Sequence, residues 1–164
     1  MPSWSAEGKW IYFKSDRSGN DQIWKVPFTR GAATQLTRGG ACEAFASPDG
    51  KLVYFTKHGW AAIWTVPVDG GPEKPVAGLE RFDKIFRSWG VLDRGIYFMS
   101  RQDAPHQTIR FFSFATRQIT SLVTLDKEPI WNYPDVALSR DGRQLLSASL
   151  DQEVNDLMLI ENFH

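Results

Sequence analysis

The sequence predicts an all-β fold built from repeated units, and three observations support this. The segment IWKVP at residues 23–27 returns as IWTVP at residues 63–67. Short apolar runs alternate along the chain with clusters of Gly, Pro, Asp, Asn and Ser, which is typical of strands joined by turns. No window sustains apolar residues at the i, i+3, i+4, i+7 spacing of an amphipathic helix. We therefore expect strands throughout.

Each unit opens with a glycine-containing turn that is followed by a strand-sized apolar run. The turn glycines Gly8, Gly50, Gly95 and Gly142 lie 42, 45 and 47 residues apart, a period typical of the four-stranded blades of a β-propeller. The third unit is the most degraded copy. We expect a single, partial propeller domain over residues 1–164 with about four four-stranded blades. The expected blades are approximately residues 2–40, 41–82, 83–128 and 129–164.

The second strand of each unit is a continuous apolar run, as at residues 52–55. Such a run suits a strand that neighbouring sheets cover on both faces. Aromatic residues make up 13% of the chain, and bulky rings fill the space between radially arranged sheets. We therefore expect Tyr12, Trp24, Tyr54 and Trp64 to pack between blades.

The tight turns are the most regular part of the repeat. Ser5-Ala6-Glu7-Gly8, Ser47-Pro48-Asp49-Gly50 and Ser139-Arg140-Asp141-Gly142 share one pattern, and the Asp-Gly pairs predict turns that join the innermost strand to the second. Residues 4–19 resemble the WD40-like (PD40) repeat of the TolB-like propeller family, with Ala6-Glu7 in place of its Pro-Asp pair. The repeat also resembles those of the tricorn protease, of prolyl oligopeptidase-type peptidases and of the propeller half of some bacterial winged-helix regulators. The resemblance covers about the whole chain and implies a carboxyl-terminal propeller segment.

The length of 164 residues accommodates four units, and the fourth ends directly after its third strand. We therefore expect an incomplete last blade with an unpaired edge, and two apolar end faces that need a neighbour. The chain could close as a four-bladed ring, join a second copy in an eight-bladed ring, or be part of a longer propeller. We favour the last as its origin, and we expect the isolated chain to self-associate, for example as a homodimer that completes the ring.

Charge and composition argue against several classes of partner. Nineteen Lys and Arg residues balance nineteen Asp and Glu residues, so the formal net charge is zero and a nucleic-acid partner is not expected. No apolar run approaches bilayer-spanning length, and the amino terminus lacks a signal-peptide pattern, so membrane insertion is not expected. Cys42 is the single cysteine, which excludes an intrachain disulfide. The resemblance implies a periplasmic or a cytoplasmic protein.

Motifs for catalysis and metal binding are missing from the sequence. There is no Gly-x-Ser-x-Gly elbow, and His58, His106 and His164 lack the spacing of metal ligands. The oxygen-rich segment at residues 16–21 could be imagined as a calcium loop. It lacks the spacing of an EF-hand, and its composition favours a hairpin turn. We expect no enzyme activity, no metal and no cofactor.

The connectors that link the outermost strand of one blade to the innermost strand of the next are the expected binding surface. In a propeller they gather at one mouth of the central channel, and here they are residues 38–43, 79–84 and 126–133. Aromatic anchors and orienting charges are typical of binding sites. The alternative is that the aromatics pack between blades and the charges are only solvated. The candidate ligand-binding residues are Glu43, Arg81, Arg87, Trp131, Tyr133 and Asp135.

The function that these features favour is a non-catalytic binding or sensory module for a protein or peptide partner. By resemblance, that partner is another envelope protein or the remainder of a regulator chain. One alternative is the accessory propeller of a peptidase or another hydrolase. A second is a structural remnant that completes a propeller with a partner chain. The repeat is shared by all these classes, so it is specific for fold and not for function.

Overall fold

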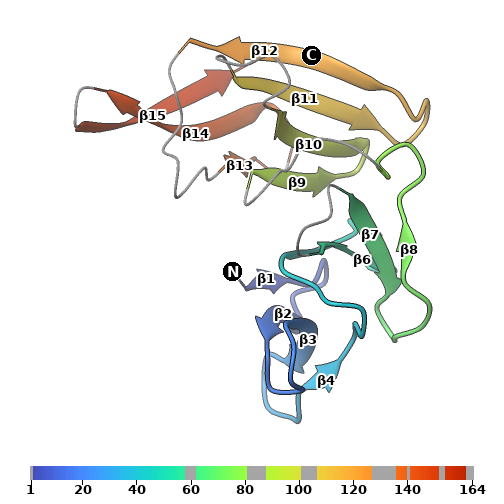
Figure 1. Ribbon diagram of the computed structural model, residues 1–164. Helices are drawn as coiled ribbons and strands as arrows, with labels where there is room; N and C mark the ends of the chain where they lie inside the picture. Colours follow the sequence, from blue (N-terminus) through green and yellow to red (C-terminus); the bar gives the residue numbers. More distant parts are fainter. Residues whose placement is uncertain are drawn as a thin grey trace. The chain divides into compact units, whose positions relative to one another are not determined.

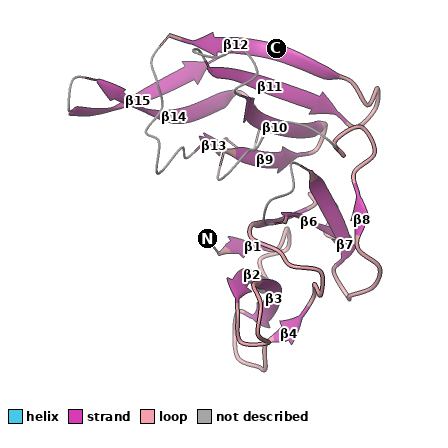
Figure 2. Cartoon of the chain, viewed as in Figure 1, coloured by secondary structure: helices cyan, strands magenta, loops and turns pink. Residues whose placement is uncertain are grey.

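Strands are the regular elements of the described parts of this protein (Figure 2). The computed structural model places them in four antiparallel sheets, each built by consecutive strands (Figure 1). The prediction of an all-β chain is confirmed. The described residues are 2–57, 62–80, 88–100, 107–126, 136–139, 141–151 and 154–161.

The first two sheets have the same order and register. Phe13 pairs with Trp24 in the first sheet, and Phe55 pairs with Trp64 at the same position of the second. The first sheet contains β1 (Ser3–Trp4), β2 (Trp10–Ser15), β3 (Gln22–Pro27) and β4 (Thr34–Gln35). The second sheet contains β5 (Ala44–Ala46), β6 (Leu52–Thr56), β7 (Ile63–Pro67) and β8 (Lys74–Pro75).

The third sheet has four strands, and the fourth has three within the described residues. The expectation of an incomplete last blade is therefore confirmed for this part of the chain. Residues 101–108 read as an irregular stretch of the degraded third copy in the sequence, but Gln107 and Thr108 belong to β11, and residues 101–106 are outside the described residues. The third sheet contains β9 (Trp89–Leu92), β10 (Gly95–Ser100), β11 (Gln107–Ser113) and β12 (Ile119–Leu125). The fourth contains β13 (Val136–Leu138), β14 (Gln144–Asp151) and β15 (Val154–Glu161).

The chain divides into two compact units, residues 1–82 with the first two sheets and residues 83–164 with the other two. We call them unit 1 and unit 2 and describe each by itself. That all four sheets belong to one domain stays a prediction. No described segment forms a helix of the length and apolarity needed to cross a bilayer.

The predicted turns at Gly8, Gly50 and Gly142 are present, and a serine organises each of them. Ser47 Oγ accepts hydrogen bonds from the N–H groups of Lys51 and Leu52 at 3.1 and 2.9 Å and donates one to Asp49 Oδ1 at 2.6 Å. Gly50 has a φ of 69°, a conformation that favours glycine. Ser139 bonds Asp141 and the Gln144 N–H in the same way, so the repeated sequence pattern folds as a repeated structure.

The core of unit 1 lies between its two sheets. Tyr12 and Ile23 of the first sheet pack there with Val53, Phe55 and Val66 of the second, and the ring of Trp64 packs against this cluster. Strand alternation places Trp24 on the other face of the first sheet, because its cross-strand partner Phe13 is out of phase with Tyr12. Of the two tryptophans predicted to pack between blades, the one at position 64 therefore does so within unit 1, and the one at position 24 faces away.

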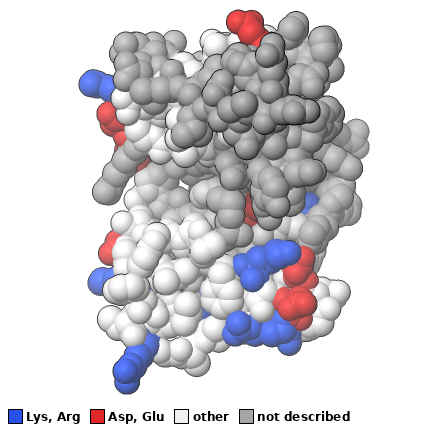
Figure 3. Space-filling view, turned by 90° about the vertical axis from the view of Figure 1, so that its left-hand side faces the viewer, with Lys and Arg blue, Asp and Glu red and all other residues white. Residues whose placement is uncertain are grey.

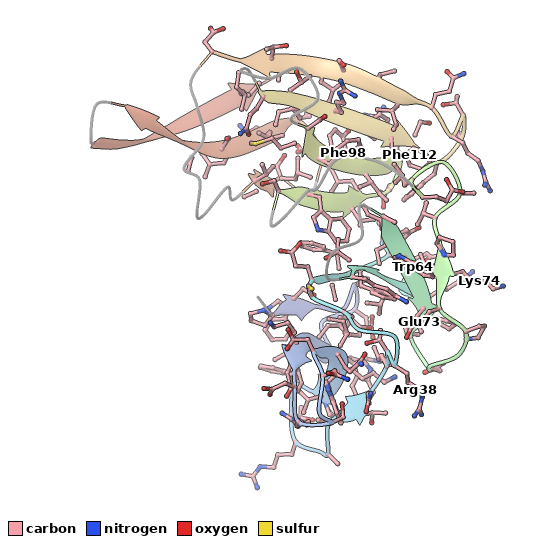
Figure 4. The ribbon with its side chains drawn as sticks, in the orientation of Figure 1. Arg38, Trp64, Glu73, Lys74, Phe98 and Phe112 are labelled. Atoms are coloured by element: carbon pink, nitrogen blue, oxygen red, sulfur yellow. The ribbon has the colours of Figure 1, made fainter. Side chains whose placement is uncertain are left out.

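The core of unit 2 shows the doubly covered strand that the apolar runs predict. Every residue of β10 is buried, and Met99 packs with Ile109, Leu125 and Leu145 between the third and fourth sheets. On the other face of the third sheet, Ile96 pairs with Phe112, whose position Figure 4 labels. Burial on both faces explains why β10 contains no charged residue.

Candidate functional site

A polar cleft of about 550 Å³ in unit 1 is the hollow that lies on one of the predicted connectors. One wall is the tip of the β2–β3 hairpin, and the other is the connector at residues 36–43, which links β4 to β5. The cleft is therefore formed by two loops at the same end of the strands of the first sheet. Its lining residues are Asp16, Gly19, Asn20, Asp21, Gln22, Arg38, Gly39 and Gly40.

The hairpin wall is a hydrogen-bonded turn, as its composition predicts. The Gly19 N–H donates to the Asp16 carbonyl oxygen at 2.7 Å, and Gly19 has a φ of 102°. Lys14 Nζ donates to Asp21 Oδ2 at 2.8 Å, and this hydrogen bond raises the pKa of Lys14 above its ordinary value. The ion pair is partly solvated, so it orients the tip more than it stabilises the fold.

Thr37 ties the start of the connector to the hairpin. Its hydroxyl accepts the Ile23 N–H at 2.9 Å and donates to Gln22 Oε1 at 2.8 Å. The Gln35 amide in turn donates to the Thr37 carbonyl oxygen at 2.7 Å. Thr37 is fully buried, so these hydrogen bonds are shielded from competing water.

Glu73, the residue directly before β8, binds the middle of the connector. Its Oε1 atom accepts the N–H groups of Arg38 and Gly39 at 2.6 and 3.1 Å. Its Oε2 atom lies 2.7 Å from Nζ of Lys57, and the two side chains are only 14% and 12% exposed. One carboxylate therefore joins the connector to Lys57, the residue that follows β6. Figure 4 labels Arg38, Trp64 and Glu73.

The electrostatics of this contact favour the charged form of Glu73. Burial by itself raises the pKa of Glu73, but hydrogen bonds from Lys57, Arg38 and Gly39 outweigh it and lower the pKa below its ordinary value. Lys57 Nζ also lies 3.8 Å from the centroid of the Trp64 ring, a cation–π geometry. Lys57 is thus held by a carboxylate and by an aromatic face together.

Gly39 fits this arrangement because it has no side chain. A Cβ atom at position 39 would lie 2.7 Å from Lys57 Nζ and 2.8 Å from Glu73 Oε2. The two atoms it would meet belong to the ion pair itself, so a larger residue would have to displace that pair. The glycine at this position is explained by close packing.

The last part of the connector joins the second sheet. The Ala41 N–H donates to the Asp21 carbonyl oxygen at 2.9 Å, and the Cys42 N–H donates to the Thr56 carbonyl oxygen at 2.9 Å. The Thr56 N–H donates back to the Glu43 carbonyl oxygen at 3.1 Å. Burial raises the pKa of the Cys42 thiol to about 11. The connector is therefore ordered along its whole length.

One of the six predicted site residues falls in the described residues. Glu43 lies at the end of this connector and is buried. The other five, Arg81, Arg87, Trp131, Tyr133 and Asp135, lie outside the described residues.

Lys57 and Glu73 were not among the residues predicted from the sequence. Register places Lys57 at the repeat position of Ser15, and Glu73 at that of Ala33. Two small residues of the first repeat copy, at residues 2–40, are thus replaced by residues of opposite charge in the second copy, at residues 41–82. This departure from the repeat is the sequence signal that could have predicted them.

Charged side chains around the cleft are of both signs. Figure 3 shows one face of the molecule, on which basic and acidic side chains of described residues lie next to one another and form no broad patch of one sign. Within the described residues, no group of three or more His, Cys, Asp or Glu side chains is placed to hold a metal ion. The oxygen-rich tip at residues 16–21 forms the predicted hairpin.

A second hollow, of about 520 Å³, lies in unit 2 and was not predicted. Its walls include Arg94, Tyr97, Phe111 and Leu122. The expectation that Gly95 is a turn glycine equivalent to Gly8 was wrong, because register places Gly95 inside β10 at the repeat position of Trp10. The ring of Phe111 covers Gly95 so closely that a Cβ atom there would lie 2.6 Å from a ring carbon.

Comparison with known proteins extends this picture. No family model matches the chain. An uncharacterized protein of Agrobacterium fabrum, Atu1656, is 36% identical over 59 residues, which are 35% of this chain and 20% of that protein. This match is too short to assign a family.

Solved structures show the fold. TolB from Acinetobacter baumannii superposes with a TM-score of 0.76 at 18% identity, over 98% of this chain and 40% of that one. A chain of a nidogen–laminin complex gives 0.71 at 12% identity, over 99% of this chain and 64% of that one. The β-propeller domain of the Trilobed protease from Pyrococcus furiosus gives 0.60 at 15% identity, over 99% and 54%.

The four sheets are therefore blades of a β-propeller, and the last described blade is incomplete. The fold is the one seen in TolB, as the repeat resemblance implies. At these identities the likeness concerns fold alone. The chain spans less than two thirds of the length of each of these proteins.

Proposed function

We propose that this chain is a non-catalytic propeller segment that binds a protein or peptide partner at the cleft of unit 1. The observation that carries the proposal is the pair of hydrogen bonds that Glu73 accepts from the N–H groups of Arg38 and Gly39. These bonds order one wall of the cleft before a partner binds. A preordered loop loses little conformational entropy on association, so more of the contact energy remains as affinity.

The charges of the cleft suit a partner that carries both signs. Asp16 is exposed on the hairpin wall, and Arg38 is exposed on the connector wall. A peptide with a basic and an acidic side chain can pair with both, whereas a polyanion would meet Asp16 as a like charge. This complementarity favours a peptide segment over nucleic acid.

The other two connectors carry the remaining candidate binding residues. Arg81 and Arg87 lie between β8 and β9 in the sequence, and Trp131, Tyr133 and Asp135 lie between β12 and β13. Because each connector joins the outermost strand of one sheet to the innermost strand of the next, all three are equivalent in the repeat. Trp and Tyr are the residues that most often dominate binding energy.

The test is binding of peptides selected from a random display library on the immobilised chain. Arg38→Glu reverses an exposed charge on the cleft and should weaken the selected peptides at least about tenfold. Lys74→Glu is the matched control, because Lys74 is exposed on β8 and does not line the cleft. Failure to select any peptide, or equal effects of the two variants, would overturn the proposal.

A role as the accessory propeller of a peptidase is the alternative, and the likeness to the Trilobed protease propeller supports it. In that case the catalytic groups lie outside this chain, and the cleft guides a substrate peptide. Joining the chain to its flanking sequence and assaying peptide hydrolysis distinguishes the two. A homodimer is a separate proposal, carried by other faces of the molecule.

A further inference from the structure

The first sheet has an apolar face on which no other described sheet of unit 1 packs. We call it the head face. Cross-strand register and ring contact define the head face as Trp4, Ile11, Phe13, Trp24, Val26 and Phe28. Trp4 and Phe28 on this face are 54% and 59% exposed, and their ring centroids lie 5.0 Å apart. The four members other than Trp4 and Phe28 are half-buried. The Arg17 guanidinium lies over part of the head face, 5.1 and 5.0 Å from the ring centroids of Phe13 and Trp24.

The second sheet repeats this pattern, but there it is covered. The residues at the same repeat positions are Val53, Phe55, Trp64 and Val66. Three of them, the valines and the phenylalanine, have no exposed surface, because Tyr12 and Ile23 of the first sheet pack on them. A face of this composition is therefore one that the fold covers with a neighbouring blade.

The fourth sheet has a second apolar face, opposite to the one that packs on the third sheet. We call it the tail face and define it by Ala137, Leu146 and Ala148. Leu145 is buried against the third sheet, so strand alternation directs Leu146 the other way, and Leu146 is 36% exposed. Its cross-strand partner Ala137 is also exposed. Leu146 follows Gly142 by four residues, as Tyr12 follows Gly8.

The repeat position of Leu146 decides what the tail face can cover. Tyr12 lies on the face of the first sheet that packs on the second. The tail face is therefore the repeat counterpart of a covering face, and the head face is the counterpart of a covered one. The contact between the first two sheets supplies the geometry for joining them.

We propose that two copies of this chain associate head to tail, with the tail face of one copy covering the head face of the other. Two such contacts close a dimer if the rotation between copies permits, and otherwise the copies extend into a longer assembly. The contact removes the exposed Trp4–Phe28 pair from water. It does not involve the peptide cleft, so it stands or falls independently of the proposed function.

Sedimentation velocity of the full chain over a dilution series tests the proposal. The wild-type chain should sediment as an assembly, and Phe28→Lys or Leu146→Glu should each raise the dissociation constant at least about tenfold. Ile119→Glu is the matched control, because Ile119 is a large apolar residue, 39% exposed, on neither face. A monomeric wild-type chain would overturn the proposal, and so would an equal effect of the control.

Mixing the two variants identifies which faces meet. Each variant alone has both of its head-to-tail contacts impaired. A mixed pair of Phe28→Lys and Leu146→Glu contains one unaltered contact and should associate more tightly than either variant alone. If the head face pairs with a second head face instead, Leu146→Glu will sediment like wild type and mixing will not restore assembly, which overturns the proposal.

Discussion

The ammonium nitrogen of Lys57 lies 2.7 Å from Oε2 of Glu73, and both side chains are largely buried. Because Oε1 of the same carboxylate accepts two connector N–H groups, the ion pair fixes a loop as well as a charge. Removing Lys57 would leave a buried carboxylate short of its cation, and removing Glu73 would leave a buried cation and two N–H groups unsatisfied.

Loss of the Glu73 carboxylate should destabilise the protein substantially. We expect Glu73→Ala to lower the free energy of unfolding by about 3 kcal/mol, because breaking a buried ion pair leaves an uncompensated charge. Urea denaturation of the full chain measures this. Asp69→Ala is the control, since Asp69 is 93% exposed and lies 3.5 Å from Lys25, and it should cost less than about 1 kcal/mol. Equal costs for the two variants would contradict the account.

The same carboxylate should make stability depend on pH. The folded-state pKa of Glu73 lies below its ordinary value of 4.5, so its ionised form contributes stability that is fully present above that value. This contribution is lost as the pH falls through the lower, folded-state pKa. The difference in unfolding free energy between wild type and Glu73→Gln should therefore shrink in acid. Asp49 and Asp141, whose pKa values are also lowered, are common to both proteins and cancel. A difference that stays constant with pH would refute this reading.

Gly39→Ala should weaken the connector by steric displacement of the ion pair. We expect a loss of about 1–3 kcal/mol, the usual cost of overpacking. Gly40→Asn is the comparison, because a Cβ atom at Gly40 meets nothing within 4 Å and asparagine tolerates its positive φ of 83°. Thermal denaturation distinguishes the two. If both variants melt with the wild type, the packing around Gly39 is not as described.

Cys42 should react slowly with thiol reagents while the protein is folded. Burial raises its pKa to about 11, so the reactive thiolate is a minor species near neutral pH. A colorimetric thiol assay should show slow modification of the native chain and rapid modification in urea. Fast modification of the native chain would mean that the end of the connector is open.

Much of the fold could be predicted from the sequence because the same pattern of turns and strands occurs several times along the chain. The copies at residues 23–27 and 63–67 form β3 and β7 with equivalent register, and the serine turns at Ser47 and Ser139 have the same hydrogen bonds. Local patterns of this kind depend on neighbours within a few residues. Periodicity therefore predicts them well.

The candidate site follows from sequence only in part. The connector at residues 38–43 could be placed from the order of strands, but the grip of Glu73 on Arg38 joins residues 35 positions apart. Such a contact depends on how two sheets pack, which no local pattern encodes. Whether Trp24 is covered depends on sheet packing in the same way. Trp24 and Trp64 occupy the same repeat position, but within unit 1 no described sheet packs on the face of the first sheet that carries Trp24.

Amide hydrogen exchange of the connector tests the central claim most directly, since the claim is that this loop is ordered before any partner binds. Protection at Arg38 and Gly39 should be high in the wild-type chain and should fall in Glu73→Ala, while β6 stays protected in both. Exchange of these two amides at the rate of an unstructured peptide in the wild-type chain would contradict the account.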